Sequence, residues 1–161
     1  MGLFGKKQES NGLTTKKEII ELVRGSMDKA ELKYTYDAEK EAFQTGFMGD
    51  DLPIAVFIYF DDVTINFHCP LNLKATEQNY QNVVWELNAI NSELKFGSFN
   101  LDAENGYIVF QYGFPYCESK VSPEFFISFL KLLVSTVDAH DGKLKEIAEK
   151  VSKDDYWNIY R

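Results

Sequence analysis

The sequence has few cysteines, few prolines and no long apolar run. Its two cysteines, Cys69 and Cys117, stand far apart and form no Cys-x-x-Cys pair. Isolated thiols are typical of proteins in a reducing compartment, so we expect a cytoplasmic protein with reduced cysteines. No apolar run reaches the length of a membrane-spanning helix, and residues 1–12 lack the apolar core of a signal peptide. We therefore expect no association with a membrane.

Basic residues are also in deficit. The chain has 17 Lys and Arg against 25 Asp and Glu, which gives a formal net charge of −8. Nucleic acids and anionic membranes are bound by clustered Lys and Arg, so this charge disfavours both as partners. A soluble protein that binds other proteins is compatible with it.

Aromatic residues, by contrast, are plentiful. Thirteen Phe and nine Tyr stand in 161 residues, of which 45% are apolar. A chain of this length buries roughly 70% of its unfolded surface, so it needs neither a disulfide nor a metal to hold a core. We predict a flexible N-terminal tail over residues 1–13 and one domain over residues 14–161.

Helical signals appear in three places, and the first two flank the predicted strands. Thr15 and Glu18 have the spacing of a capping box, which predicts a helix over residues 16–30. Apolar residues at helical spacing predict a second helix over residues 74–94, with Gly97 near its exit.

The last helix has the clearest start. Ser122 is a favourable N-cap, and Pro123 suits the first turn. An apolar stripe follows, made of Phe126, Phe129, Leu130, Leu133, Val137, Leu144, Ile147 and Val151. We interpret this stripe as core, and we expect Gly142 to kink the helix or to split it.

Four β-rich runs follow the first helix, at residues 32–37, 42–49, 53–60 and 63–69. A two-residue turn at Asp61-Asp62 would join the last two as a hairpin. Its apolar side would pair Phe60 with Val63, Ile58 with Ile65, Val56 with Phe67, and Ile54 with Cys69. Its other side would pair Tyr59 with Thr64, Phe57 with Asn66, and Ala55 with His68. The sequence thus predicts one core-facing side and one mixed side.

A second hairpin shows the same division. With residues 103–106 as the loop, Asn-Gly supplies residues that tolerate a positive φ. The apolar side then pairs Leu101 with Ile108 and Phe99 with Phe110. The other side pairs Asp102 with Tyr107, Asn100 with Val109, and Ser98 with Gln111. Both hairpins predict an apolar sheet face that helices cover.

The second sheet face mixes large apolar residues with polar ones. Phe57, Tyr59, Tyr107 and Val109 are its large apolar members and our predicted partner-binding residues. Several such residues on one face are typical of a surface that a partner or a second copy covers. An ordinary solvated face with scattered aromatic residues is the alternative.

The order of elements and a run of spaced residues resemble the YbjN family of small bacterial proteins. The order is helix, four strands, helix, two strands and helix. The matching residues, spread over about 72–141, are Asn88, Asn91, Gly97, Ser98, Phe99, Leu101, Asp102, Gly106, Pro115, Ser122, Glu124, Val137 and Asp138. Gln111 stands where this resemblance leads us to expect a basic residue, and Phe114 stands in place of an aliphatic one.

The resemblance implies an α+β fold like that of the type III secretion chaperones, with an antiparallel sheet and helices packed on one face. Members of the family are labelled sensory transduction regulators. The chaperone relatives are acidic dimers that bind an extended segment of a partner. The family has no catalytic motif that could be carried over to this chain.

Several residues could support other chemistry. Asp61 and Asp62 could form an acid pair, but adjacent turn residues point apart and are typically solvated. The stretch 102–106 is similar to a calcium loop, but its Gly comes one place early. His68, Cys69, Cys117 and His140 could be zinc ligands, yet the first two point to opposite faces of one strand. We therefore expect no metal and no cofactor.

The remaining candidates also have structural interpretations. Cys117 lacks a neighbouring base, which favours a plain thiol over a reactive one. Asn88 and Asn91 could contact a ligand, but capping or bridging the backbone near the sheet is the favoured interpretation. No nucleophile–base pair can be placed, so we expect a protein that is not an enzyme. We predict a protein-binding adaptor or regulator that is dimeric, and a small-molecule-sensing regulator is the alternative.

Overall fold

The computed structural model describes residues 14–117 and 119–151. The predicted tail at residues 1–13 lies outside the described residues, as does the end of the predicted domain at residues 152–161. The elements are α1 (Lys16–Lys29), β1 (Tyr34–Asp37), β2 (Ala42–Met48), β3 (Pro53–Phe60), β4 (Thr64–Lys74), α2 (Tyr80–Glu93), β5 (Ser98–Leu101), β6 (Tyr107–Pro115), α3 (Pro123–Ile147) and β7 (Glu149–Lys150).

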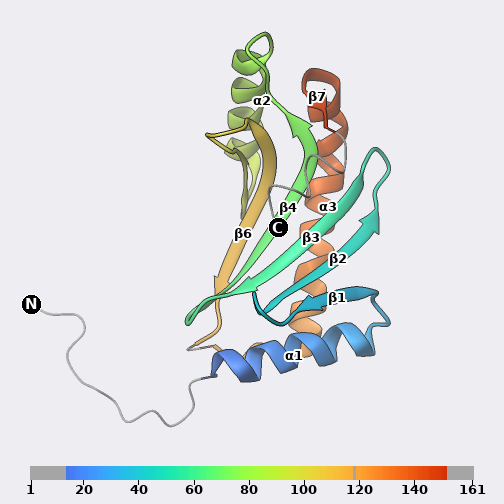
Figure 1. Cartoon of the computed structure of the whole chain (residues 1–161), viewed down its shortest axis with the longest axis vertical. Coiled ribbons are helices and arrows are strands. Elements are labelled where there is room, and N and C mark those ends of the chain that lie inside the picture. The colour runs from blue at the N-terminus through green and yellow to red at the C-terminus, as the bar shows by residue number, and fades with distance from the viewer. Residues whose placement is uncertain (1–13, 118, 152–161) are drawn as a thin grey trace, which may run out of the picture.

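The strands form one antiparallel sheet in the order β1-β2-β3-β4-β6-β5, and β7 pairs with β4. The helices pack on one side of this sheet, with α3 running behind the strands (Figure 1). The predicted α+β class and element order are confirmed, and the two-residue strand β7 is an addition to them.

The core lies between the sheet and the helices. Phe43, Phe67 and Phe110, from three strands, are fully buried in this core, and the Phe67 ring lies 6.2 Å from that of Phe126 of α3. Burying a side chain of this size stabilises the fold by about 1.5–3 kcal/mol. The alternation seen in the sequence therefore marks the helix-covered face correctly.

The ends of the helices follow from their capping residues. At α1 the Thr15 and Glu18 side chains each accept a hydrogen bond from the other residue's backbone N–H, which is the predicted capping box. At α3 the Ser122 hydroxyl accepts from the backbone N–H of Phe125 at 3.0 Å. Both caps use backbone donors that the first helical turn leaves unpaired.

Gly142 does not split the last helix, because α3 runs unbroken from Pro123 to Ile147. The apolar stripe ends with the helix, so Val151 is not part of it. A Cβ atom at position 142 would collide with the carboxylate of Asp51, which lies in the loop between β2 and β3. Glycine at this position therefore lets that loop approach the helix closely.

The predicted register of the first hairpin is wrong by two residues. Phe60 pairs with Ile65, Ile58 with Phe67, Tyr59 with Asn66, and Phe57 with His68. The cause is Asp61, whose side chain accepts hydrogen bonds from the backbone N–H groups of Val63 and Thr64. This Asx-type turn lengthens the loop and takes in Val63, which is 49% exposed instead of facing the core as predicted. A shift of two leaves the side chains that pair in the two strands on their predicted faces.

The predicted register of the second hairpin is confirmed. Phe99 pairs with Phe110 and Leu101 with Ile108, while Asn100 pairs with Val109 on the other side. Gly106 has a φ of 74°, the left-handed conformation that the Asn-Gly turn was expected to use. Turn chemistry thus fixed this register.

The second helix begins later than predicted, because β4 continues to Lys74 and α2 starts at Tyr80. Pro70 lies inside β4, and the pairing of β4 with β6 is irregular between Pro70 and Lys74. Asn72 has a φ of 56° within this irregularity. A proline, which lacks an N–H donor, and a left-handed asparagine are typical of a bulged strand.

Candidate partner-binding face

The sheet face turned away from the helices carries the predicted partner-binding residues. Phe57 and Tyr59 lie on β3, and Tyr107 and Val109 lie on β6, all on this side. We call these four residues, together with His68 of β4, the aromatic face. It faces the viewer in Figure 1, with the helices behind the sheet.

On β3 and β4 the rings of this face contact one another. The ring centroids of Phe57 and Tyr59 are 6.3 Å apart, and the two planes are nearly parallel at 15°. Tyr59 meets the His68 ring edge-on, at 5.4 Å. Such pairs contribute about 0.5–1.5 kcal/mol beyond the area that they bury. They hold three side chains as one ordered surface.

The aromatic face has two parts, because β4 lies between β3 and β6. Val109 is opposite Pro70 and Tyr107 is opposite Lys74, while Phe57 is opposite His68. Strands two places apart in a sheet are about 10 Å apart. An occupant that contacts both parts must therefore cross β4.

Burial divides these residues unequally. Phe57, Tyr107 and Val109 are only 8%, 7% and 4% exposed, whereas Tyr59 and His68 are half-buried. Burial also lowers the pKa of His68, which favours the neutral imidazole. Tyr59 and His68 are thus the members with the most accessible surface.

Polar groups border the aromatic face. The Asn66 amide donates to a carboxylate oxygen of Asp61 at 3.0 Å and to the Thr64 hydroxyl at 2.9 Å. Four donors around Asp61 hold the pKa of its carboxyl well below the usual range, the Thr64 hydroxyl bond being the largest cause. Across the sheet, the Asn100 amide donates to the Gln111 side chain at 3.2 Å. A rim of this kind is typical of a surface that fixes how a partner is oriented.

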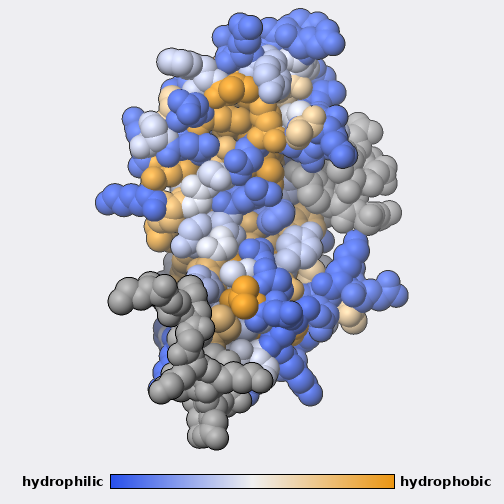
Figure 2. Space-filling model, turned by 90° about the vertical axis from the view of Figure 1, so that its left-hand side faces the viewer, coloured by the Kyte–Doolittle hydropathy of each residue, from blue (hydrophilic) through white to orange (hydrophobic). Residues whose placement is uncertain are grey.

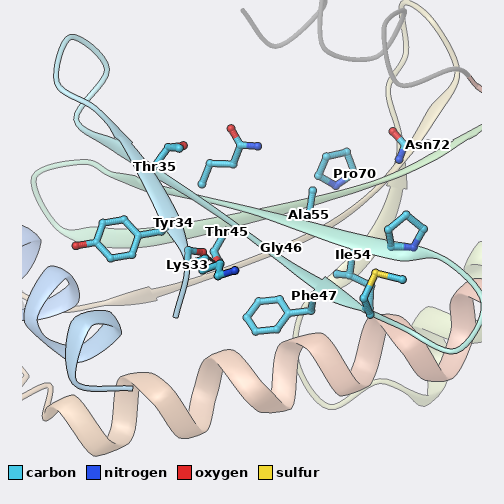
Figure 3. Close-up of a pocket in the computed structure, with 13 residues that line it drawn as sticks. Lys33, Tyr34, Thr35, Thr45, Gly46, Phe47, Ile54, Ala55, Pro70 and Asn72 are labelled. Carbon is cyan, nitrogen blue, oxygen red and sulfur yellow. Dashed lines mark hydrogen bonds between the residues drawn. The ribbon is translucent and has the colours of Figure 1, made fainter. Parts of the chain in front are cut away.

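A groove of about 460 Å³ adjoins the aromatic face over strands β1 to β4. Thr35, Ala55, Pro70 and Asn72 lie along it on the side of the sheet away from α3 (Figure 3). It offers a small number of polar groups among apolar ones. Its size lies in the range of ligand-binding pockets.

The other sequence-derived candidates have structural roles. The Asn91 amide donates to the backbone carbonyl of Phe99, and its oxygen accepts from the Phe99 N–H, both at 2.8 Å. This is the predicted bridge between helix and sheet, and Asn88 is exposed instead. Cys69 points into the core, where burial raises the pKa of its thiol.

Two features were missed in the sequence. Asp141 of α3 is fully buried, and its position four residues after Val137 and three before Leu144 places it on the apolar stripe, which is the signal that marks it. On α2, Tyr80, Val84 and Trp85 are exposed. Apolar surface gathers on the upper part of the side where α2 and β6 lie (Figure 2). The exposure of the α2 residues could not be predicted, because a helical stripe does not say how far the neighbouring elements reach.

Among residues 14–117 and 119–151, no group of His, Cys, Asp or Glu side chains is arranged to hold a metal ion. Within the same residues, no helix has the combination of length and apolarity that crossing a membrane requires.

The fold and this face define an α+β protein whose antiparallel sheet has helices on one side and an aromatic patch on the other. The family model YbjN, described as "Putative bacterial sensory transduction regulator", matches residues 20–146. The chain therefore belongs to the YbjN family, as its resemblance predicted.

A solved structure shares this fold. It is the "Crystal structure of YbjN, a putative transcription regulator from E. coli", and it superimposes with a TM-score of 0.63. The match covers 81% of this chain and 95% of that chain at 14% sequence identity, so it shows the fold alone. No curated protein matches the chain in sequence.

Proposed function

We propose that this protein is a non-enzymatic, cytoplasmic binding module, an adaptor or regulator, and that the aromatic face is its contact surface for a protein partner. The observation that carries the proposal is the contact of Phe57, Tyr59 and His68 on a sheet face away from the helices. The family and the E. coli structure are both described with the word regulator, which supports a regulatory role.

The chemistry of the face favours an extended segment with apolar side chains as the partner. Tyr59 offers a large ring with a polar end, and the Asn66 and Gln111 amides stand beside the rings. Tyrosine is enriched at the energetic centres of interfaces because it combines area with a hydrogen-bonding group. A second copy of the chain, forming a homodimer, is one protein that could supply such a segment.

The net charge of −8 supports a protein partner over a polyanion. The edge strands β1 and β5 are four residues long each, so strand addition at an edge would form few hydrogen bonds. The side chains on the aromatic face would therefore provide most of the affinity.

Substituting Tyr59 tests this proposal. Tyr59→Glu places a charge on the half-buried part of the face, and we expect it to abolish partner capture or self-association while the circular dichroism spectrum stays unchanged. Thr35→Glu is the matched control, because Thr35 lies on the same sheet side but in the edge strand β1. The readouts are sedimentation velocity and mass spectrometry of complexes isolated from the native host. A folded Tyr59→Glu protein that associates normally would contradict the proposal.

The groove beside the aromatic face favours a second candidate function, that of a small-molecule-sensing regulator. A ligand present at 100 times its Kd stabilises a protein by about 2.7 kcal/mol, which a thermal-shift screen of metabolites detects. Ala55 lies in the groove, so Ala55→Trp should fill it and abolish the shift. Ala38→Trp, in an exposed turn, should keep it. A library that shifts neither the parent nor the control counts against sensing.

A further inference from the structure

Helix α2 carries an exposed surface that combines large apolar side chains with an absence of charge. Tyr80, Val84 and Trp85 are 53%, 40% and 74% exposed. The exposed positions of α2 before Glu93 are Tyr80, Gln81, Asn82, Val84, Trp85, Asn88 and Ser92. We call these seven residues the α2 face, and none of them is charged. Glu86, the one charged residue among residues 80–92, pairs with Lys143 of α3 instead.

The α2 face lies on the outside of the molecule and is separate from the aromatic face. The helix stands at one edge of the structure, where it packs against β5 and α3 (Figure 1). Val83, Leu87 and Ile90 are its buried residues, so the α2 face is turned away from the core. The aromatic face belongs to the opposite side of the sheet. A contact at one of the two surfaces therefore leaves the other unoccupied.

The ends of α2 differ from those of the other two long helices. In α1, Glu18 stands in the first turn and Lys29 in the last, and α3 has Glu124 and Lys145 in the same places. Within α2 the first turn has no acid, the last turn has no basic residue, and Asn79 forms no side-chain capping bond. The partial positive charge at the start of a helix and the negative charge at its end are stabilised by such groups. The turns of α2 itself supply neither.

These two properties favour a second copy of the chain as the occupant of the α2 face. Two chains of net charge −8 repel each other, so they approach most readily where both surfaces are uncharged. In a two-fold pair with antiparallel helices, the positive end of each helix dipole lies toward the negative end of the other. A second copy thus offers both ends of α2 the compensation that its own turns lack.

The size of the α2 face indicates a reversible contact. A helix of 14 residues is about 21 Å long and about 12 Å across. This surface is smaller than the roughly 800 Å² per partner of a standard interface. Exposed Trp and Tyr are the residue types that contribute most to the energy of small contacts. We therefore expect a dimer whose population rises with protein concentration.

We propose that the α2 face joins two copies of this chain into a reversible dimer, in which the α2 helices pack antiparallel about a two-fold axis near Trp85. A residue close to a two-fold axis lies near its own counterpart. Position 85 of one copy is therefore close to position 85 of the other. The dimer does not rest on the proposed function, because the aromatic face lies outside the contact.

Substituting Trp85 in the full-length protein tests the contact. Trp85→Lys and Trp85→Glu each bring two like charges together across the axis, and the exposure of Trp85 should leave the circular dichroism spectrum unchanged. Sedimentation velocity from about 1 μM to about 500 μM covers weak association. We expect the sedimentation coefficient of the parent to rise over this range and both variants to stay monomeric. Leu132→Lys is the matched control, since Leu132 is a half-exposed apolar residue of α3, and it should behave as the parent does.

Mixing the two charge variants tests whether the occupant is a second copy. Equal amounts of Trp85→Lys and Trp85→Glu should restore the dimer, because opposite charges then meet across the axis. A parent that stays monomeric overturns the inference, as do variants that still dimerise or a mixture in which the dimer does not return. If circular dichroism shows that the Trp85 variants unfold, Asn88→Lys and Asn88→Glu, at another exposed position of the α2 face, take their place.

Tyr59→Glu separates this inference from the proposed function. Alone in solution, this variant should sediment as the parent does, while it loses the capture of a protein partner. If Tyr59→Glu abolishes the dimer and Trp85→Lys keeps it, the α2 contact is wrong and the aromatic face is the contact between copies. If Trp85→Lys abolishes the dimer and Tyr59→Glu still captures the partner, the α2 contact stands and the proposed function fails.

Discussion

Asn88 and Asn91 lie one turn apart on α2, yet only Asn91 connects the helix to the sheet. Its amide makes two hydrogen bonds to the backbone of Phe99, at the start of β5. Asn91→Ala leaves a buried N–H and C=O unpaired, so we expect the free energy of unfolding to fall by about 2–3 kcal/mol. Asn88→Ala, at an exposed position, should change it by less than about 0.5 kcal/mol. Urea denaturation measures both, and equal effects would disprove the assignment.

Asp141 makes the stability of the protein depend on pH. Its carboxyl is fully buried, neither oxygen has a hydrogen-bond partner among the described residues, and Asp138 and Asp51 lie nearby. Burial, aided by these two acids and opposed by Lys145, raises the pKa of Asp141 to about 6. The unfolded value is about 3.9, so the folded state binds this proton more tightly. Its contribution is therefore present below about pH 4 and is lost as the pH rises to about 6.

Asp141→Asn removes the charge at neutral pH. We expect the free energy of unfolding at pH 7 to rise by about 1–2 kcal/mol and its slope between pH 4 and pH 6 to flatten. Glu146→Gln, an exposed acid on the same helix, should leave the slope unchanged. Chemical denaturation at a series of pH values makes the comparison, and a parent-like slope in Asp141→Asn would refute the role of this carboxyl.

At the scale of elements, the β2–β3 loop is held against α3 by a few specific contacts. The Asp138 carboxylate accepts from the backbone N–H of Asp50 at 2.7 Å, and Lys145 pairs with Asp51 at 3.1 Å. Gly142 leaves room for Asp51 between them. The loop is therefore attached to the last third of the helix rather than free in solvent.

Two helical glycines should respond differently to alanine. Gly25 of α1 has open space around it, so Gly25→Ala should stabilise the protein by about 0.5–1 kcal/mol through helix propensity. Gly142→Ala gains the same propensity but displaces the Asp51 side chain from Lys145, a surface pair worth up to about 1 kcal/mol. We therefore expect Gly142→Ala alone to change the free energy of unfolding little. When Asp51→Ala is added, the full stabilisation from helix propensity should be recovered. Thermal unfolding of these three variants tests this, and a full gain from Gly142→Ala alone would argue against the close approach.

The two hairpins show what local sequence determines. The Asn105-Gly106 turn tolerates a positive φ, and the register read from it was correct. Asp61-Asp62 looked like a two-residue turn, but the Asp61 side chain replaces backbone partners and lengthens the loop. Alternation along a strand survives a shift of two, so the faces were predictable where the register was not.

Helix boundaries depended on contacts that sequence periodicity does not contain. Residues 74–79 precede α2 because β4 runs on past Pro70, where the left-handed Asn72 bends the strand. Gly142 was read as a break, whereas the structure uses its missing side chain for a tertiary contact. In both cases a distant segment decided the outcome.

For the molecule as a whole, the excess of negative charge is larger than its ion pairs can offset. The ion pairs within the described residues lie at or near the surface, where each contributes about 0–1 kcal/mol. Repulsion within a chain of net charge −8 acts over longer distances. At 0.01 M salt the screening length is about 30 Å, and at 0.15 M it is about 8 Å.

We therefore expect the melting temperature to rise when NaCl is increased from about 10 to about 150 mM. Screening weakens the repulsion between like charges more than it weakens the attraction within the ion pairs. Sucrose at matched osmolality serves as the control for excluded-solute effects. Differential scanning fluorimetry measures the change, and a fall in the melting temperature would show that the ion pairs dominate.

The location of the candidate site was predictable, but its accessibility was not. Strand alternation placed Phe57, Tyr59, Tyr107 and Val109 on one face, away from the helices. That three of them are buried could not follow from alternation, because burial depends on what lies above the sheet. Alternation placed His68 on this face too, but its position opposite Phe57 followed only from the observed register.

The sheet order has a kinetic consequence. Strands β1, β2 and β3 each pair with the next strand along the chain, and β5 pairs with β6 in the same way. Among the strands of residues 14–117 and 119–151, the ladder between β4 and β6 alone joins these two local units, across the whole of α2. Contacts that are distant in sequence slow folding, since the closure of the intervening loop must come first. The rate at which this protein folds is thus expected to be set by one docking event, in which the 98–115 hairpin finds the edge of β4.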